Sequence, residues 1–186
     1  MRQCLKTLLV ALILLFGVGS LTGCNKKNDP TAGFKNPKII EYKTEKGTIQ
    51  LTYDDDGSYE VTENDPYVIL KNADNNFRID IDYSNNTVKQ QETAKENFAK
   101  DTKNYTVIKN VELNGYEGYT MVSKNYTTAN VYLYLDKDND IISNIKVSPV
   151  KTSDAEKELN NGKKAEDVLY NQEKVMQILK TVKYVK

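Results

Sequence analysis

The chain has 186 residues, with 26 Lys and Arg residues and 26 Asp and Glu residues, so its formal net charge is zero. A chain without a basic excess has no general attraction to nucleic acid, and nucleic acid is therefore excluded as an expected partner. The sequence contains no His, which removes the commonest general base and the commonest metal ligand from any predicted active site. The length suits a single domain that is large enough to bury a core.

The first 24 residues have the pattern of an exported protein. A short basic start, MRQCLK, precedes the apolar run TLLVALILLFGV, and the segment ends in Leu21-Thr22-Gly23-Cys24. The apolar run is shorter than the roughly 20 residues of a membrane-spanning helix, but it suits a secretory signal. The LTGC ending resembles the bacterial lipobox. This resemblance implies that residues 1–23 are a signal peptide and that the Cys24 thiol receives a diacylglyceryl group.

The predicted lipid would anchor the mature chain to the extracytoplasmic face of the cell membrane, because two acyl chains are enough for stable anchoring. Cys4 would be removed with the signal peptide, so Cys24 is the only cysteine left and no intrachain disulfide is expected. Residues 24–36 are polar and contain Pro30 and Gly33. They are predicted to form a flexible tether between the lipid and the domain.

Residues 37–186 are predicted to form one extracytoplasmic α+β domain. Short alternating runs separated by turn residues predict antiparallel strands, and the segment 47–62 is expected to be a hairpin around its Asp-Asp-Asp-Gly turn. Two main helices are expected, one over 88–103 and one over about 165–182. The expected fold is a single antiparallel sheet of about six to eight strands with these two helices packed on it.

This order of elements resembles the Mog1/PsbP-like fold. The resemblance is carried by the FRIDIDY strand before a helix, by the VELNGYEGY stretch and by the closing segment QILKTVKY, and it covers roughly residues 45–186. Many members of that family are non-catalytic accessory or scaffold proteins, so the resemblance implies such a role here. A cystatin-like or lipocalin-like sheet is the alternative fold.

The acidic clusters lack a complete set of metal ligands. The segment 136–140, DKDND, begins like a calcium-binding loop, but Ile141 stands where that loop needs Gly and Val147 where it needs Glu. Serine chemistry needs a base, and without His only a Ser–Lys pair could supply one; the G-x-S-x-G motif does not occur around the Ser residues. We therefore expect no metal, no cofactor and no enzymatic activity.

The candidate partner-binding residues lie on the predicted solvent faces of strands. Alternation in FRIDIDY turns its charged residues away from the core. In VYLYL the aliphatic residues share one face and the two Tyr share the other, where they would neighbour the next strand. Tyr is enriched at protein interfaces, although the two rings could instead lie under a helix. The predicted partner surface consists of Tyr132, Tyr134, Arg78, Asp80, Asp82 and Lys146.

Together these features predict a membrane-anchored surface lipoprotein that binds a membrane or envelope protein, such as the ectodomain of a sensor or transporter, without catalysis. The alternative is a lipoprotein that binds a small ligand or a glycan in a pocket between sheet and helix. A flat exposed patch would favour the first function, and a Tyr-lined cavity would favour the second.

Overall fold

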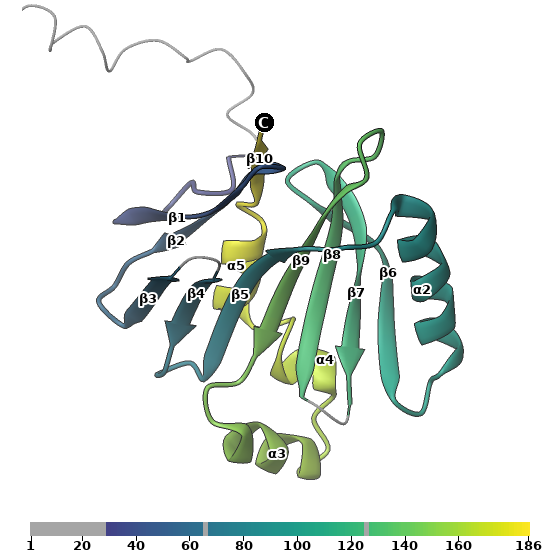
Figure 1. Cartoon of the computed structure of the whole chain (residues 1–186). Coiled ribbons are helices and arrows are strands. Elements are labelled where there is room, and N and C mark those ends of the chain that lie inside the picture. The colour runs from purple at the N-terminus through teal and green to yellow at the C-terminus, as the bar shows by residue number, and fades with distance from the viewer. Residues whose placement is uncertain (1–28, 65–66, 125–126) are drawn as a thin grey trace, which may run out of the picture.

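The computed structural model describes residues 29–64, 67–124 and 127–186 (Figure 1). The predicted signal peptide 1–23 and the predicted lipidation site Cys24 lie outside these residues. Within the described ranges, no helix combines the length and the apolar character needed to cross a membrane.

The larger of two sheets has seven strands in the order β3-β4-β5-β9-β8-β7-β6, and each neighbouring pair is antiparallel. The chain runs through β3, β4 and β5, crosses to the far edge through helix α2 (Val88–Lys100), and returns through β6 to β9, which pairs with β5. The predicted antiparallel α+β organisation is confirmed. The strands are β3 (Tyr59–Asn64), β4 (Tyr67–Asn72), β5 (Phe77–Tyr83), β6 (Tyr105–Leu113), β7 (Tyr116–Ser123), β8 (Thr128–Asp136) and β9 (Ile141–Ser148).

A second sheet of three strands, in the order β1-β2-β10, was not predicted. Its strands are β1 (Pro37–Thr44), β2 (Gly47–Asp54) and β10 (Lys183–Val185). The expected hairpin over 47–62 is wrong, because β2 pairs with β1 and β10 whereas β3 pairs with β4. The acidic loop between β2 and β3 turns from one sheet to the other, and Asp54, the last residue of β2, binds the preceding chain. Asp54 Oδ1 accepts the backbone N–H groups of Lys35 and Asn36 at 2.9 and 2.6 Å, so the end of the predicted tether is held on the domain.

Four helices occur in the described residues: α2, α3 (Thr152–Asn160), α4 (Ala165–Val168) and α5 (Glu173–Leu179). Helix α2 begins where predicted, with a capping box in which the Thr87 hydroxyl accepts the Gln90 N–H and the Gln90 side chain accepts the Thr87 N–H. The single helix expected over 165–182 is instead α4, α5 and the approach to β10. Residues 168–170 are all buried, and three consecutive residues cannot share one face of a helix, so a continuous helix through this segment would expose at least one of them.

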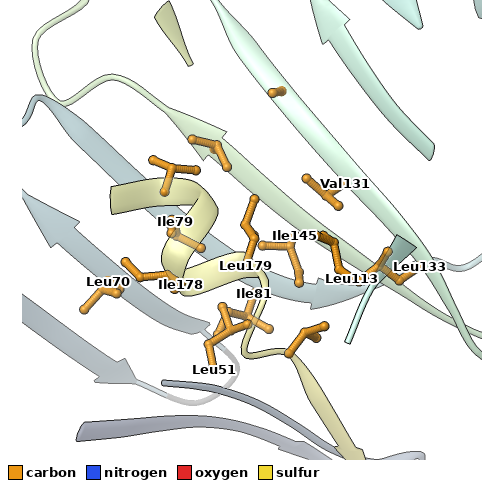
Figure 2. Close-up of a cluster of buried hydrophobic side chains, with 14 of the residues drawn as sticks. Leu51, Leu70, Ile79, Ile81, Leu113, Val131, Leu133, Ile145, Ile178 and Leu179 are labelled. Atoms are coloured by element: carbon orange, nitrogen blue, oxygen red, sulfur yellow. The ribbon is translucent and has the colours of Figure 1, made fainter. Parts of the chain in front are cut away.

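The main core lies between the two sheets and α5 (Figure 2). Ile79 of β5, Val131 of β8 and Ile145 of β9 are fully buried, as is Ile178 of α5. The alternation in FRIDIDY and VYLYL therefore predicted the core-facing side of these strands correctly. Helix α2 is placed elsewhere: it lies at the β6 edge of the large sheet, away from the small sheet and α5 (Figure 1).

Candidate binding surface

Helix α2 covers the part of the large sheet that carries the two predicted anchor tyrosines. Tyr134 is only 8% exposed, and its hydroxyl donates a hydrogen bond to Glu92 of α2. Tyr132 is half-buried and stacks on the ring of Tyr119, with the centroids 5.0 Å apart. The expected exposure of Tyr134 is therefore wrong, and Tyr132 is exposed only in part. The reason is that α2, which follows β5, packs over β6 and β7 and reaches β8.

A buried polar network fixes α2 to the sheet. Gln91 of α2 is 1% exposed, and its Nε2 donates a 2.5 Å hydrogen bond to Tyr119 Oη. Gln91 Oε1 accepts hydrogen bonds from Ser84 Oγ at 2.8 Å and from Asn86 Nδ2 at 2.9 Å. Both ends of the amide are thus satisfied, as a buried amide requires. The space that was predicted to hold a ligand between helix and sheet is filled here by Gln91 and by the fully buried Tyr119.

The electrostatics of this interface also favour a fixed helix. Burial raises the pKa of the Tyr119 and Tyr134 hydroxyls, and for Tyr134 the neighbouring Glu92 carboxylate adds to the rise. Burial alone would raise the pKa of Glu92, but its hydrogen bonds from Lys95 and Tyr134 outweigh that effect and hold the pKa below its usual value. At neutral pH Glu92 is therefore a charged acceptor that binds both Lys95 and Tyr134.

The remaining predicted residues lie on the part of the same sheet face that α2 does not reach. We call the surface of Ile69, Arg78, Asp80, Asp82, Asn144 and Lys146 the open sheet face. In the strand register Asp80 of β5 lies opposite Lys146 of β9, and Asp82 lies opposite Asn144. The four predicted charged residues are thus brought together. Tyr132 of β8 lies opposite Asn144 and so borders this charged group, whereas Tyr134 lies opposite Ile142, further from it.

A groove of about 440 Å³ lies on the open sheet face, and Tyr42 of β1 also lines it. The hydroxyl of Tyr42 donates a 2.9 Å hydrogen bond to Asp82 Oδ1, and the Tyr83 N–H donates to the same oxygen at 2.7 Å. Arg78 Nε donates a 2.5 Å hydrogen bond to Asp80 Oδ1. Each carboxylate is therefore held through one oxygen by a neighbouring group.

The β9 side of the groove carries hydrogen-bond donors. Asn144 Oδ1 accepts a 2.8 Å hydrogen bond from Asn130 Nδ2, which leaves the Asn144 amide nitrogen as a donor. Lys146 is exposed, and no ion pair or hydrogen bond joins its ammonium to another described residue. With two acids and two bases the groove has no formal net charge. It presents carboxylate oxygens and the Asp80-bound Arg78 guanidinium on β5, and nitrogen donors on β9.

Sequence reasoning did not identify Tyr42 or Ile69 as parts of this surface, nor Gln91 as the residue that fixes α2. Tyr42 lies two residues after Ile40, so strand alternation gives it at most the same face as Ile40. Its position beside Asp82 depends on how the small sheet packs against β5, and no local pattern contains that information. Gln91 is one of several polar residues in the helix sequence, and no local pattern distinguishes it from the exposed ones.

The acidic turns bind partners within the chain. Asp56 pairs with Lys174 at 2.7 Å, and Asp136 pairs with Lys186 at 2.6 Å. Asp140 Oδ1 accepts the Val88 N–H at 2.7 Å, so the 136–140 turn is hydrogen-bonded to the first residue of α2. In the part of the chain that the structure describes, no three His, Cys, Asp or Glu residues are grouped so that they could hold a metal ion.

Comparison with known proteins gave no significant match to a family model, to a curated protein sequence or to a solved structure.

Proposed function

We propose that the protein is a membrane-anchored lipoprotein whose extracytoplasmic domain binds a membrane or envelope protein without catalysing a reaction. The observation that carries this proposal is the open sheet face, where Arg78, Asp80, Asp82 and Lys146 gather on a part of the sheet that none of the four described helices covers. Charges of both signs in a fixed arrangement select a complementary surface and reject others, which is how charged groups give specificity at protein interfaces.

We also propose that the domain has the Mog1/PsbP-like fold. The support is the order of elements: a meander of β3 to β5, a helix that crosses the sheet, a second meander of β6 to β9, and a helical closing segment. An accessory role, which is common among proteins of that fold, agrees with a binding surface rather than a catalytic centre.

The anchoring part is tested by Cys24→Ala. Cells that produce either version are labelled with a palmitate analogue and fractionated. The unchanged protein should incorporate the label and remain in the membrane fraction, and the variant should lose both properties because no thiol remains to carry the lipid. Label or firm membrane attachment in the variant would reject the lipoprotein assignment.

The partner-binding part is tested by crosslinking on intact cells, identification of the partner by mass spectrometry, and binding measurements with the purified partner. Lys146→Glu and Arg78→Glu reverse charges on the open sheet face and should weaken binding at least tenfold. Lys89→Glu, on the exposed side of α2, is the matched control and should bind normally. Equal binding by all four proteins would place the partner surface elsewhere.

A second candidate function, the binding of a small ligand, is favoured by the groove of about 440 Å³ on the same face. Pockets for small molecules commonly have volumes of about 300–1,000 Å³. No residue of α2 lines this groove, whereas the expected pocket was one between sheet and helix.

A further inference from the structure

The polar groups around the groove are held in place before any ligand arrives. Asp82 is tied by Tyr42 and Tyr83 through Oδ1, and Asp80 is tied by Arg78 through Oδ1. The Asn144 amide is oriented by its hydrogen bond from Asn130. Asp80 Oδ2, Asp82 Oδ2 and Asn144 Nδ2 make no hydrogen bond with a described residue. Groups that are already oriented lose little freedom when a ligand binds, and this lowers the cost of association.

The groove is also divided by chemical character. The two carboxylates lie on β5 together with Arg78, whose guanidinium is already paired with Asp80, and the amide and ammonium donors that pair with no described residue lie opposite them on β9. Neighbouring strands are about 4.8 Å apart. A ligand that lies across these two strands must therefore offer a cationic donor to β5 and an anionic acceptor to β9, a few ångströms from each other.

We propose that the groove binds a zwitterion of the α-amino-acid class. The ligand ammonium contacts Asp82 Oδ2 and Asp80 Oδ2, and its carboxylate accepts hydrogen bonds from Asn144 Nδ2 and Lys146 Nζ. In an α-amino acid one carbon separates the two charged groups, which suits two adjacent strands. The inference rests on the second candidate function, ligand binding in this groove, and names the ligand class.

Two features argue against other ligand classes. A neutral sugar would leave the charges of Asp82 and Lys146 uncompensated, and Tyr42 is too buried, at 8% exposed, to offer its ring face for stacking on a sugar. An ion of a single sign would meet a groove that carries two acids and two bases and has no net attraction for it. Ile69 of β4 is half-buried opposite Asp80 and lines the groove, which favours an apolar side chain on the ligand.

The test uses isothermal titration calorimetry on the full chain in detergent, with the twenty common amino acids as probes and leucine as the expected ligand. Leucine amide lacks the carboxylate and N-acetylleucine lacks the ammonium, and each should bind at least tenfold more weakly than leucine. Soluble phosphoethanolamine and glucose are included as a lipid-headgroup zwitterion and a neutral sugar. The proposal is overturned if no amino acid binds, if a singly charged derivative binds as tightly as leucine, or if phosphoethanolamine or glucose binds more tightly.

Variants locate the site. Asp82→Asn and Lys146→Gln keep the size of each side chain but remove its charge, and each should weaken leucine binding at least tenfold. Lys71→Gln is the matched control, because Lys71 lies on the same face of β4 but pairs with Glu60 and does not line the groove. Circular dichroism checks that each variant is folded. Unchanged leucine binding by Asp82→Asn and Lys146→Gln would overturn the proposed site.

The result is separable from the protein-partner proposal. Absence of amino-acid binding together with normal capture of the crosslinked protein would reject only the ligand inference. Leucine binding without any captured protein would reject only the partner proposal.

Discussion

The side-chain amide of Gln91 on α2 donates a 2.5 Å hydrogen bond to the hydroxyl of Tyr119 on β7. Both side chains are almost completely buried, so this bond is made away from water at the centre of the contact between helix and sheet. The bond helps to hold α2 on one part of the outward sheet face, so that this part is covered and the remainder is not. Helix α2 is fixed over β6, β7 and β8, and the charged residues of β5 and β9 remain accessible.

Tyr119→Phe should lower the free energy of unfolding by about 1–3 kcal/mol, because it leaves the buried Gln91 Nε2 without its acceptor. Urea denaturation at neutral pH measures the change. Tyr132→Phe is the control: the Tyr132 hydroxyl makes no hydrogen bond with a described residue, so its removal should change stability by less than about 0.5 kcal/mol. Equal effects of the two changes would mean that the Gln91 bond does not hold the helix.

Tyr134→Ala should lower the free energy of unfolding by about 3–5 kcal/mol, the usual cost of removing a large buried aromatic ring. The ring is packed under α2 and its hydroxyl is bound to Glu92, so both packing and a hydrogen bond are lost. Thermal and urea unfolding measure the change. A loss below about 1 kcal/mol would show that the ring faces solvent, as the alternation in VYLYL alone had suggested.

The sequence predicted those elements whose signals are local. The strict alternation of FRIDIDY placed Ile79 in the core and Asp80 outside, and the structure has both in these positions. Helix α2 begins after Thr87, where a capping residue and a stretch free of Gly and Pro predicted it. Alternation also turned the charged residues of FRIDIDY away from the core, but the pairing of β5 with β9, which brings Lys146 beside them, was not predicted.

Features that depend on long-range packing were not predicted. Local alternation shows that Tyr134 and Leu133 face opposite ways, but both faces of β8 are covered here, one by α2 and one by the core. Strand β2 was paired with the wrong neighbour, because an Asp-Gly turn signal cannot distinguish a hairpin from a corner between two sheets. Strand β10 joins β2 from the far end of the chain, and Tyr184 lies opposite Ile49.

Gly118→Ala should be strongly destabilising because β7 and β8 approach each other too closely for a side chain. A Cβ atom at this position would lie 1.9 Å from the backbone oxygen of Tyr132, and neither strand can yield without losing its pairing. We expect a loss of about 3 kcal/mol or more in urea denaturation, at the upper end of overpacking effects. Gly115→Ala is the comparison: its Cβ would meet open space, and only its positive φ of 83° costs energy, about 1–2 kcal/mol. A smaller effect at Gly118 than at Gly115 would contradict the close approach of the two strands.

The buried tyrosines should make the protein sensitive to alkali. Burial raises the pKa of Tyr83 to about 12 and also raises the pKa of Tyr119, whereas a tyrosine in the unfolded chain ionises near pH 10. Above about pH 10 the unfolded chain therefore holds fewer protons than the folded chain. The free energy of unfolding is at its full value below that pH and falls as the pH rises toward the pKa values of the folded protein.

The chain contains 13 Tyr and no Trp, so ultraviolet absorbance of the phenolate reports tyrosine ionisation directly. The buried tyrosines should ionise above pH 10, together with the loss of the circular dichroism signal. Tyr119→Phe removes one of the shifted groups, so the variant should lose less of its own stability than the unchanged protein loses over the same alkaline range. Reversible ionisation of all tyrosines near pH 10 without loss of circular dichroism would contradict the burial of these rings.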